Sequence, residues 1–175
     1  VSVLVSCYGL LQLAGLVTIN QGGVRLDATF GNATYLAVYM LFNIFIAALY
    51  LADAWVEKGK EKGPGKRAGA MWLYGSVIAL DFLILFFTAT RGALLGLLGG
   101  AVLATLLLIA QAPRSRTAWR AGVGILAIAV LAVAFWFNRD AAWIERVEPL
   151  HRLATISLSD NTTKSRFMNI GMAVK

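Results

Sequence analysis

The chain has 175 residues and a formal net charge of +7; 59% of its residues are hydrophobic and 14% are charged. Soluble domains carry about one-quarter charged residues, so this composition excludes an ordinary soluble domain and predicts an all-α, polytopic helical membrane protein. The positive residues lie in short loops between apolar runs, which indicates insertion topology rather than nucleic-acid binding.

Apolar runs with short polar breaks recur along residues 1–137, which we assign to a transmembrane helical region. About five transmembrane helices are predicted, at about residues 1–19, 35–55, 70–90, 93–110 and 121–137. Residues 138–175 are expected to begin an extracytoplasmic loop with amphipathic helices. Because the chain starts without Met inside one apolar run and stops inside an amphipathic stretch, we expect it to be a fragment of a longer membrane protein.

The loops between the runs predict which side of the membrane each segment faces. Loop 56–69 carries five Lys or Arg residues, and loop 111–120 carries three Arg residues. If consecutive runs alternate across the membrane, both loops lie on one side, which the positive-inside rule makes cytoplasmic. Residues 20–34, 88–92 and 138–175 then share the extracytoplasmic side.

Arg91 lies in a short hairpin, residues 88–92, between two apolar runs. A guanidinium so close to the membrane is costly unless it snorkels to the surface or meets an anion. A snorkelling anchor is the simpler interpretation of one Arg at a helix end. The predicted topology argues against it, because it puts Arg91 on the side where positive charge is not expected.

Two features inside the runs have structural alternatives. Small residues recur every four positions at Gly92, Gly96, Gly100 and Ala104, and such a stripe predicts close packing of a neighbouring helix. Asp81 lies in mid-run, where an ionisable residue suggests a functional site. The alternative is a protonated or hydrogen-bonded Asp81 that faces another helix, with Asn43 as a candidate partner.

The polar tail contains one predicted surface helix. Trp143, Val147, Leu150 and Ala154 share one helical face, and Pro149 either divides this helix or starts a second one. His151, the only histidine, is interpreted as an interfacial loop residue rather than a catalytic base. With Cys7 as the only cysteine, the chain offers neither a disulfide nor a cysteine or histidine metal cluster, and we expect no metal site.

Three arginines on separate extracytoplasmic segments, Arg25, Arg91 and Arg166, could converge at the membrane boundary. Fixed guanidinium groups suit a diphosphate whose lipid tail stays in the bilayer. Without a Ser/His/Asp set or a carboxylate pair, the chemistry that these residue types allow is electrostatic stabilisation of a leaving diphosphate. A transporter or flippase for an anionic lipid-linked substrate fits these residues nearly as well, and a structural membrane subunit is a third possibility.

Three motifs, in order, resemble those of the O-antigen ligase and polymerase superfamily of bacterial membrane glycosyltransferases. Residues 25–37, RLDATFGNATYLA, resemble the family's R…FGN…LA segment. Thr90-Arg91-Gly92-Ala93 is similar to its [ST]-R-G-A hairpin, and Ser165-Arg166 is similar to the start of its large periplasmic loop. One departure is Ala33, where the family usually has proline after the asparagine.

The resemblance implies an inner-membrane enzyme of polysaccharide or lipopolysaccharide biosynthesis that needs no metal or other cofactor. Such enzymes move a glycan from a polyprenyl-diphosphate carrier to a hydroxyl of a glycan, lipid or protein acceptor. Ligase, polymerase and protein O-oligosaccharyltransferase all remain open. Arg25 and Arg91 match positions expected to bind the diphosphate, and Arg166 matches an arginine of the loop that closes on it. Asn32, Thr90 and Gly92 are expected to support the site. The catalytic base is expected outside this chain, which would then be inactive alone.

Overall fold

The computed structural model describes residues 1–20, 25–56 and 64–111, several short pieces between residues 122 and 154, and residue 172. These residues form helices, with no strand among them. The elements are α1 (Ser2–Leu13), the 3₁₀ turn η1 (Ala28–Phe30), α2 (Ala33–Val56), α3 (Pro64–Phe87), α4 (Arg91–Gln111) and α7 (Glu148–Ala154). The all-α prediction is confirmed for this part of the chain.

Two of the described helices are long and apolar enough to cross a membrane, over Ala33–Ala54 in α2 and Ala68–Phe87 in α3. Only 28% and 17% of their most apolar windows are buried inside the structure. The central helix of a soluble protein would bury far more of its apolar surface. The five predicted crossings are not confirmed, because α1 and the apolar part of α4, Arg91–Leu107, are shorter, and the run at 121–137 lies mostly outside the described residues.

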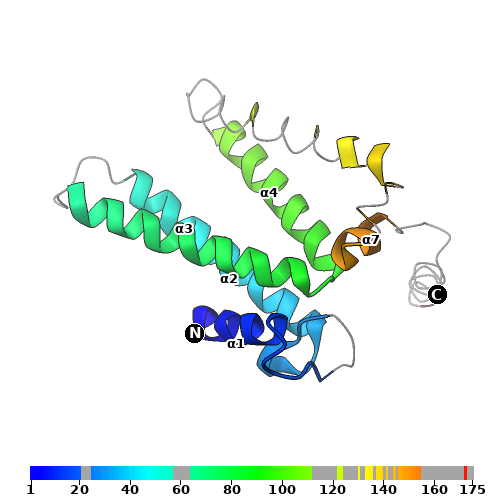
Figure 1. The fold of residues 1–175 in the computed structure, drawn as a ribbon. Coiled ribbons are helices and arrows are strands. Elements are labelled where there is room, and N and C mark those ends of the chain that lie inside the picture. The colour runs from blue at the N-terminus through cyan, green and yellow to red at the C-terminus, as the bar shows by residue number, and fades with distance from the viewer. Residues whose placement is uncertain are drawn as a thin grey trace.

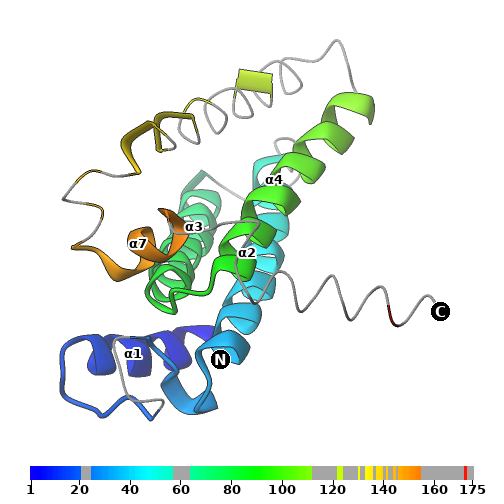
Figure 2. The same ribbon diagram turned by 90° about the vertical axis from the view of Figure 1, so that its right-hand side faces the viewer.

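Helices α2 and α3 run antiparallel, side by side, and α1 lies below α3 in both views (Figures 1 and 2). Helix α4 turns back from the end of α3 and packs on α2, and α7 lies beside the start of α4 (Figure 1). The largest fully buried apolar side chains gather where α1, the connector between α1 and α2 (residues 14–32), the start of α2 and the end of α3 meet. They include Leu26, Leu36, Met40, Ile84 and Leu85. This end of the helix pair is therefore the best-packed part of the described structure.

Helix α1 ends at Leu13, six residues before the end of the predicted run. Gly15 adopts a left-handed φ of 74°, and the N–H groups of Gly15 and Leu16 donate back to the carbonyl oxygens of Gln12 and Leu11. This is a Schellman ending, for which glycine is the favoured residue. A helix of 12 residues is about 18 Å long, well short of the roughly 30 Å hydrocarbon core of a bilayer.

The buried residues of α1, Ser6, Gly9 and Gln12, are small or polar. Val5, Tyr8 and Leu10 are partly buried against the core, whereas Leu4 is 75% and Leu13 is 44% exposed. Gly9 allows close contact, because a Cβ at this position would lie 3.0 Å from Cδ1 of Ile84 in α3. Polar groups facing the protein and apolar groups facing outward are typical of a helix surrounded by lipid.

The small-residue stripe of α4 packs against α2 at its two middle positions. A Cβ at Gly96 would lie 3.6 Å from Leu41, and a Cβ at Gly100 would lie only 2.5 Å from Cζ of Phe45. A Cβ at Gly92 would meet nothing within 4 Å, and Ala104 is exposed. The stripe is therefore a packing surface over part of its length, with α2 as its partner.

Candidate functional site

The connector that carries Arg25 lies directly against the end of α3. The N–H group of Leu26 donates to the carbonyl oxygen of Phe87, the last residue of α3, at 3.2 Å. The side chain of Leu26 is fully buried. Two of the three predicted site segments, the connector and the Arg91 hairpin, are thus neighbours in space.

Arg25 binds the hairpin through two separate donors. Its Nε atom donates to the carbonyl oxygen of Thr88 at 3.0 Å, and its Nη2 atom donates to Oγ1 of Thr90 at 3.1 Å. Such a pair of directed bonds uses the planar, rigid geometry of the guanidinium group, which lysine lacks. The half-buried Arg25 side chain is therefore oriented along the hairpin.

The hairpin itself is tightly turned. Thr88 closes the end of α3, because its hydroxyl donates to the carbonyl oxygen of Leu85 at 2.6 Å. Ala89 has a φ of 49°, a left-handed conformation that costs a residue with a Cβ about 1–2 kcal/mol. Helix α4 then begins, with the carbonyl oxygen of Thr90 accepting from Leu94.

Arg91 is the first residue of α4 and is half-buried. The first turn of a helix carries backbone N–H groups without partners in that helix, and its dipole favours negative charge. The Arg91 side chain thus starts at the positively polarised end of α4, next to the Thr90 hydroxyl that Arg25 binds. This arrangement can attract an anion such as a phosphate group.

The three residues predicted to support the site differ in their roles. Thr90 joins segments, because its hydroxyl accepts from Arg25 and lies 3.5 Å from the carbonyl oxygen of Ala33. Asn32 caps α2, since its Oδ1 atom accepts from the N–H group of Thr34 at 2.8 Å. Nothing in the described structure requires glycine at Gly92, which is exposed.

Ala33 is the first residue of α2. Proline is favoured at the first position of a helix. Alanine at this position and the proline that is usual in the motif resembled by residues 25–37 are therefore both compatible with a helix that starts here.

The third predicted arginine, Arg166, lies outside the described residues.

In the tail, Pro149 lies in the first turn of α7 and is buried, so it starts a helix rather than dividing one. His151 lies on the exposed side of this short helix, and Trp143 is outside the described part of the chain.

Asp81 does not belong to this site. It is completely buried, and its Oδ1 atom accepts from the hydroxyl of Ser6 in α1 at 2.8 Å. The suggested partner Asn43 is wrong, because the Asn43 side chain donates to the carbonyl oxygen of Tyr39 in its own helix. Oδ2 of Asp81 has no hydrogen-bond partner among the described residues.

Sequence reasoning missed a polar cluster beneath the connector. Asp27 is fully buried and Gln12 is 3% exposed, and the Nε2 atom of Gln12 donates to Oδ1 of Asp27 at 2.7 Å. A signal was present, since Gln12 carries an amide within an otherwise apolar run. Its partner could not be read from the sequence.

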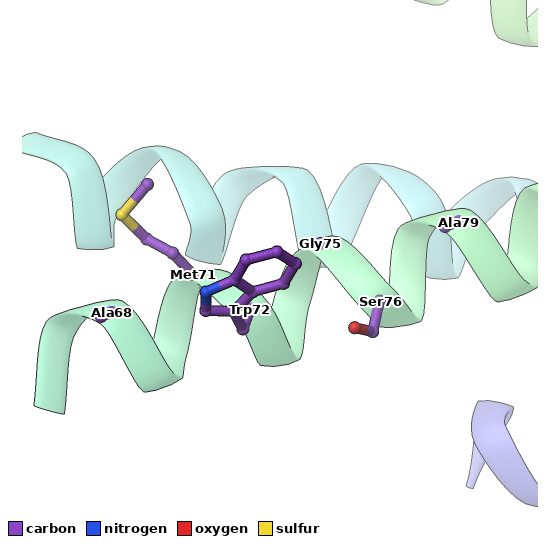
Figure 3. A pocket seen from close by; sticks show the side chains of 6 residues that line it. All are labelled: Ala68, Met71, Trp72, Gly75, Ser76 and Ala79. Carbon is purple, nitrogen blue, oxygen red and sulfur yellow. The ribbon is translucent and has the colours of Figure 1, made fainter. Parts of the chain in front are cut away.

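A groove of about 560 Å³ lies along residues 68–79 of α3 (Figure 3), away from the end of this helix where Arg25 and Arg91 lie. Its lining contains no charged side chain: Ala68, Met71, Trp72, Gly75, Ser76 and Ala79. An anion would lose its hydration there without compensation, so the groove is no candidate for the diphosphate. The described residues also contain no cluster of three or more potential metal ligands from His, Cys, Asp and Glu.

The chain was compared with known proteins on three levels. Protein-family models, curated proteins and solved structures give no match. The resemblance to O-antigen ligases therefore stays a prediction. Any function proposed for this chain rests on that resemblance and on the geometry of the arginines.

Proposed function

We propose that this protein is a membrane glycosyltransferase of the O-antigen ligase type, which transfers a glycan from a polyprenyl-diphosphate carrier to an acceptor hydroxyl. One observation carries the proposal: Arg25 donates to both Thr88 and Thr90, so its guanidinium group is held beside the residue that precedes Arg91. Arg91 is the next residue after Thr90 and the first of α4, so two cationic residues from distant segments of the chain lie near one end of α2 and α3. Paired guanidinium groups suit a diphosphate.

In this proposal the arginines act on the leaving group. The acceptor hydroxyl attacks the anomeric carbon and loses its proton to a base outside the described residues. A new glycosidic bond forms as the bond between the anomeric carbon and the phosphate oxygen breaks, and the carrier diphosphate leaves with the electron pair. Arg25 and Arg91 stabilise the negative charge that develops on that oxygen. Arg166 is proposed to complete the set.

The membrane setting is part of the proposal. Helix α2 ends at Val56 and α3 begins at Pro64, so the lysine-rich residues 57–63 connect the two helices. Lys66 and Arg67 lie in the first turn of α3, at the end opposite Arg91. The positive-inside rule makes that end cytoplasmic and the arginine site extracytoplasmic. We propose five crossings in a bacterial inner membrane, with membrane lipids around the apolar faces and the carrier's isoprenoid tail in the bilayer.

The test measures release of the free carrier diphosphate by the protein in membranes supplied with a polyprenyl-diphosphate-linked glycan and an acceptor. Arg91→Lys keeps the charge but loses the planar fork, so it separates diphosphate binding from simple anchoring. We expect release to collapse while the protein still inserts and accumulates normally. The control is Arg146→Lys, a change of the same type at an exposed tail residue.

Two results would contradict the proposal. If the wild type releases no carrier with any acceptor but moves the lipid-linked glycan across the bilayer, the protein is a transporter. If Arg91→Lys, Arg91→Ala and wild type release the carrier equally, Arg91 is an anchor and the site lies elsewhere.

A further inference from the structure

The amide of Gln12 binds the connector through both of its polar atoms. The Nε2 atom donates to Oδ1 of Asp27 at 2.7 Å and to the carbonyl oxygen of Thr18 at 3.0 Å. The Oε1 atom accepts from the N–H group of Ala28 at 2.8 Å. One side chain at the end of α1 therefore determines where two consecutive connector residues lie.

Asp27 uses both of its oxygen atoms to hold the same turn. While Oδ1 faces Gln12, Oδ2 accepts from the backbone N–H group of Asn20 at 2.9 Å. Asp27 is completely buried, and a buried carboxylate is costly unless hydrogen bonds compensate it. The chain before and after residues 21–24 is thus tied to a single carboxylate.

The backbone of the connector is held in a conformation that it would not adopt by itself. Ala28 has a φ of 44°, a left-handed value that costs a residue with a side chain about 1–2 kcal/mol. Such a conformation persists only where surrounding contacts impose it. Here the contact is the hydrogen bond from Ala28 to Gln12, because it fixes the N–H group that comes directly after Asp27.

The cluster is coupled to the arginine site through the backbone of one intervening residue, Leu26. Leu26, which separates Asp27 from Arg25, is fully buried and bonded to Phe87. With Leu26 and Asp27 both held, the Cα atom of Arg25 has little freedom. Its guanidinium group then reaches the carbonyl oxygen of Thr88 and the hydroxyl of Thr90.

We propose that Gln12 and Asp27 are positioning residues for the carrier diphosphate: they hold the connector so that Arg25 meets the Arg91 hairpin. This inference rests on the proposed function, because its consequence for the carrier exists only if the arginines bind the diphosphate. A buried apolar pair would anchor α1 equally well. The amide of Gln12 and the carboxylate of Asp27 also fix the orientation of the connector, since their donors and acceptors pair in only one arrangement.

The pairing of Gln12 with Asp27 can be tested with one substitution that breaks it and a second that restores it. Asp27→Asn turns the acceptor that faces Gln12 into an amide group. The Gln12 amide cannot flip to accommodate it, because its oxygen is already needed by the N–H group of Ala28. Adding Gln12→Glu gives the new amide an acceptor, keeps an acceptor for the N–H group of Ala28 and restores the net charge, but it removes the donor to the carbonyl oxygen of Thr18. The control is Asp53→Asn, which removes a carboxylate at an exposed position of α2.

Two measurements on the protein in membranes compare these variants with wild type. Amide hydrogen exchange of the peptide that contains Leu26 and Ala28 reports the connector itself, and steady-state carrier release gives KM for the polyprenyl-diphosphate donor and kcat. For Asp27→Asn we expect the peptide to exchange roughly tenfold faster and KM to rise roughly tenfold, the size of one lost hydrogen bond. The Gln12→Glu/Asp27→Asn double variant should lie between Asp27→Asn and wild type in both, because the bond to Thr18 stays missing. The Asp53→Asn control should match wild type.

A loss of folded protein alone would change the amount of active enzyme and not KM. The inference is overturned, with the proposed function intact, if Asp27→Asn leaves KM unchanged, or if the double variant has a KM no lower than that of Asp27→Asn. A wild type that releases no carrier overturns the proposed function, and the inference with it. That failure is recognised in the wild type before any variant is made.

Discussion

The Nε atom of Arg25 lies 3.0 Å from the carbonyl oxygen of Thr88, which is 63 residues later in the chain. The same guanidinium group reaches the hydroxyl of Thr90 at 3.1 Å. These bonds join the connector to the hairpin that positions Arg91. Arg25 is therefore both a structural link and a cation beside the candidate diphosphate site.

Replacing Arg25 by lysine tests this double role. A single ammonium group cannot reproduce two bonds in the plane of a guanidinium, so we expect Arg25→Lys to raise KM for the carrier roughly tenfold or more, the cost of at least one charge-assisted hydrogen bond. Carrier release in membranes measures it. Equal KM values for Arg25→Lys and wild type would remove Arg25 from the site.

The Thr90 hydroxyl can be removed with little change in shape. In Thr90→Val the Nη2 atom of Arg25 loses the acceptor that lies at 3.1 Å, and we expect KM for the carrier to rise several-fold to tenfold, as for one lost hydrogen bond. Thr90→Ser keeps the hydroxyl and should behave like wild type. Thr29→Val, at an exposed position, is the control, and a Thr90→Ser variant as poor as Thr90→Val would argue against this role of the hydroxyl.

Adjacent glycines in α4 provide a matched pair for helix packing. A Cβ at Gly100 would lie 2.5 Å from Cζ of Phe45, whereas a Cβ at Gly99 would meet nothing within 4 Å. Gly100→Ala should therefore destabilise the protein by about 1–3 kcal/mol, as overpacking does, and Gly99→Ala should not. Thermal unfolding in detergent distinguishes them.

The contact can also be relieved from its other side. Phe45→Leu shortens the side chain that faces Gly100, so it should recover much of the stability lost in Gly100→Ala. If Gly99→Ala is as harmful as Gly100→Ala, α4 does not pack on α2 through the stripe.

The buried pair of Ser6 and Asp81 suits a double-mutant cycle. Ser6→Ala removes the 2.8 Å hydrogen bond to Oδ1 of the buried Asp81, which should lower the free energy of unfolding by about 1–3 kcal/mol. In an Asp81→Leu background the same change should cost much less, because no polar group is then left without a partner. Additive effects in a denaturant titration would show that the two side chains do not interact.

The sequence by itself determined the local elements. The apolar runs at 35–55 and 70–90 correspond to α2 and the body of α3, and residues 88–90 form the predicted tight turn before α4. Pro149 starts α7, one of its two expected roles. Helices, turns and caps depend on neighbours within about four positions, so composition and spacing reveal them. The helix predicted over residues 1–19 was too long. Gly15, which ends α1, cannot be distinguished by sequence from other small residues in an apolar stretch.

Only the tertiary structure decided which distant groups meet. Asp81 binds Ser6, 75 residues away, rather than Asn43, and Gln12 binds Asp27 and Ala28 across the connector. The charge and spacing of the loops predict that Arg25 and Arg91 lie on one side of a membrane. They do not reveal that Thr88 and Thr90 are the acceptors for Arg25. These hydrogen bonds are short-ranged and directional, so they depend on how α1 and the connector pack on α3.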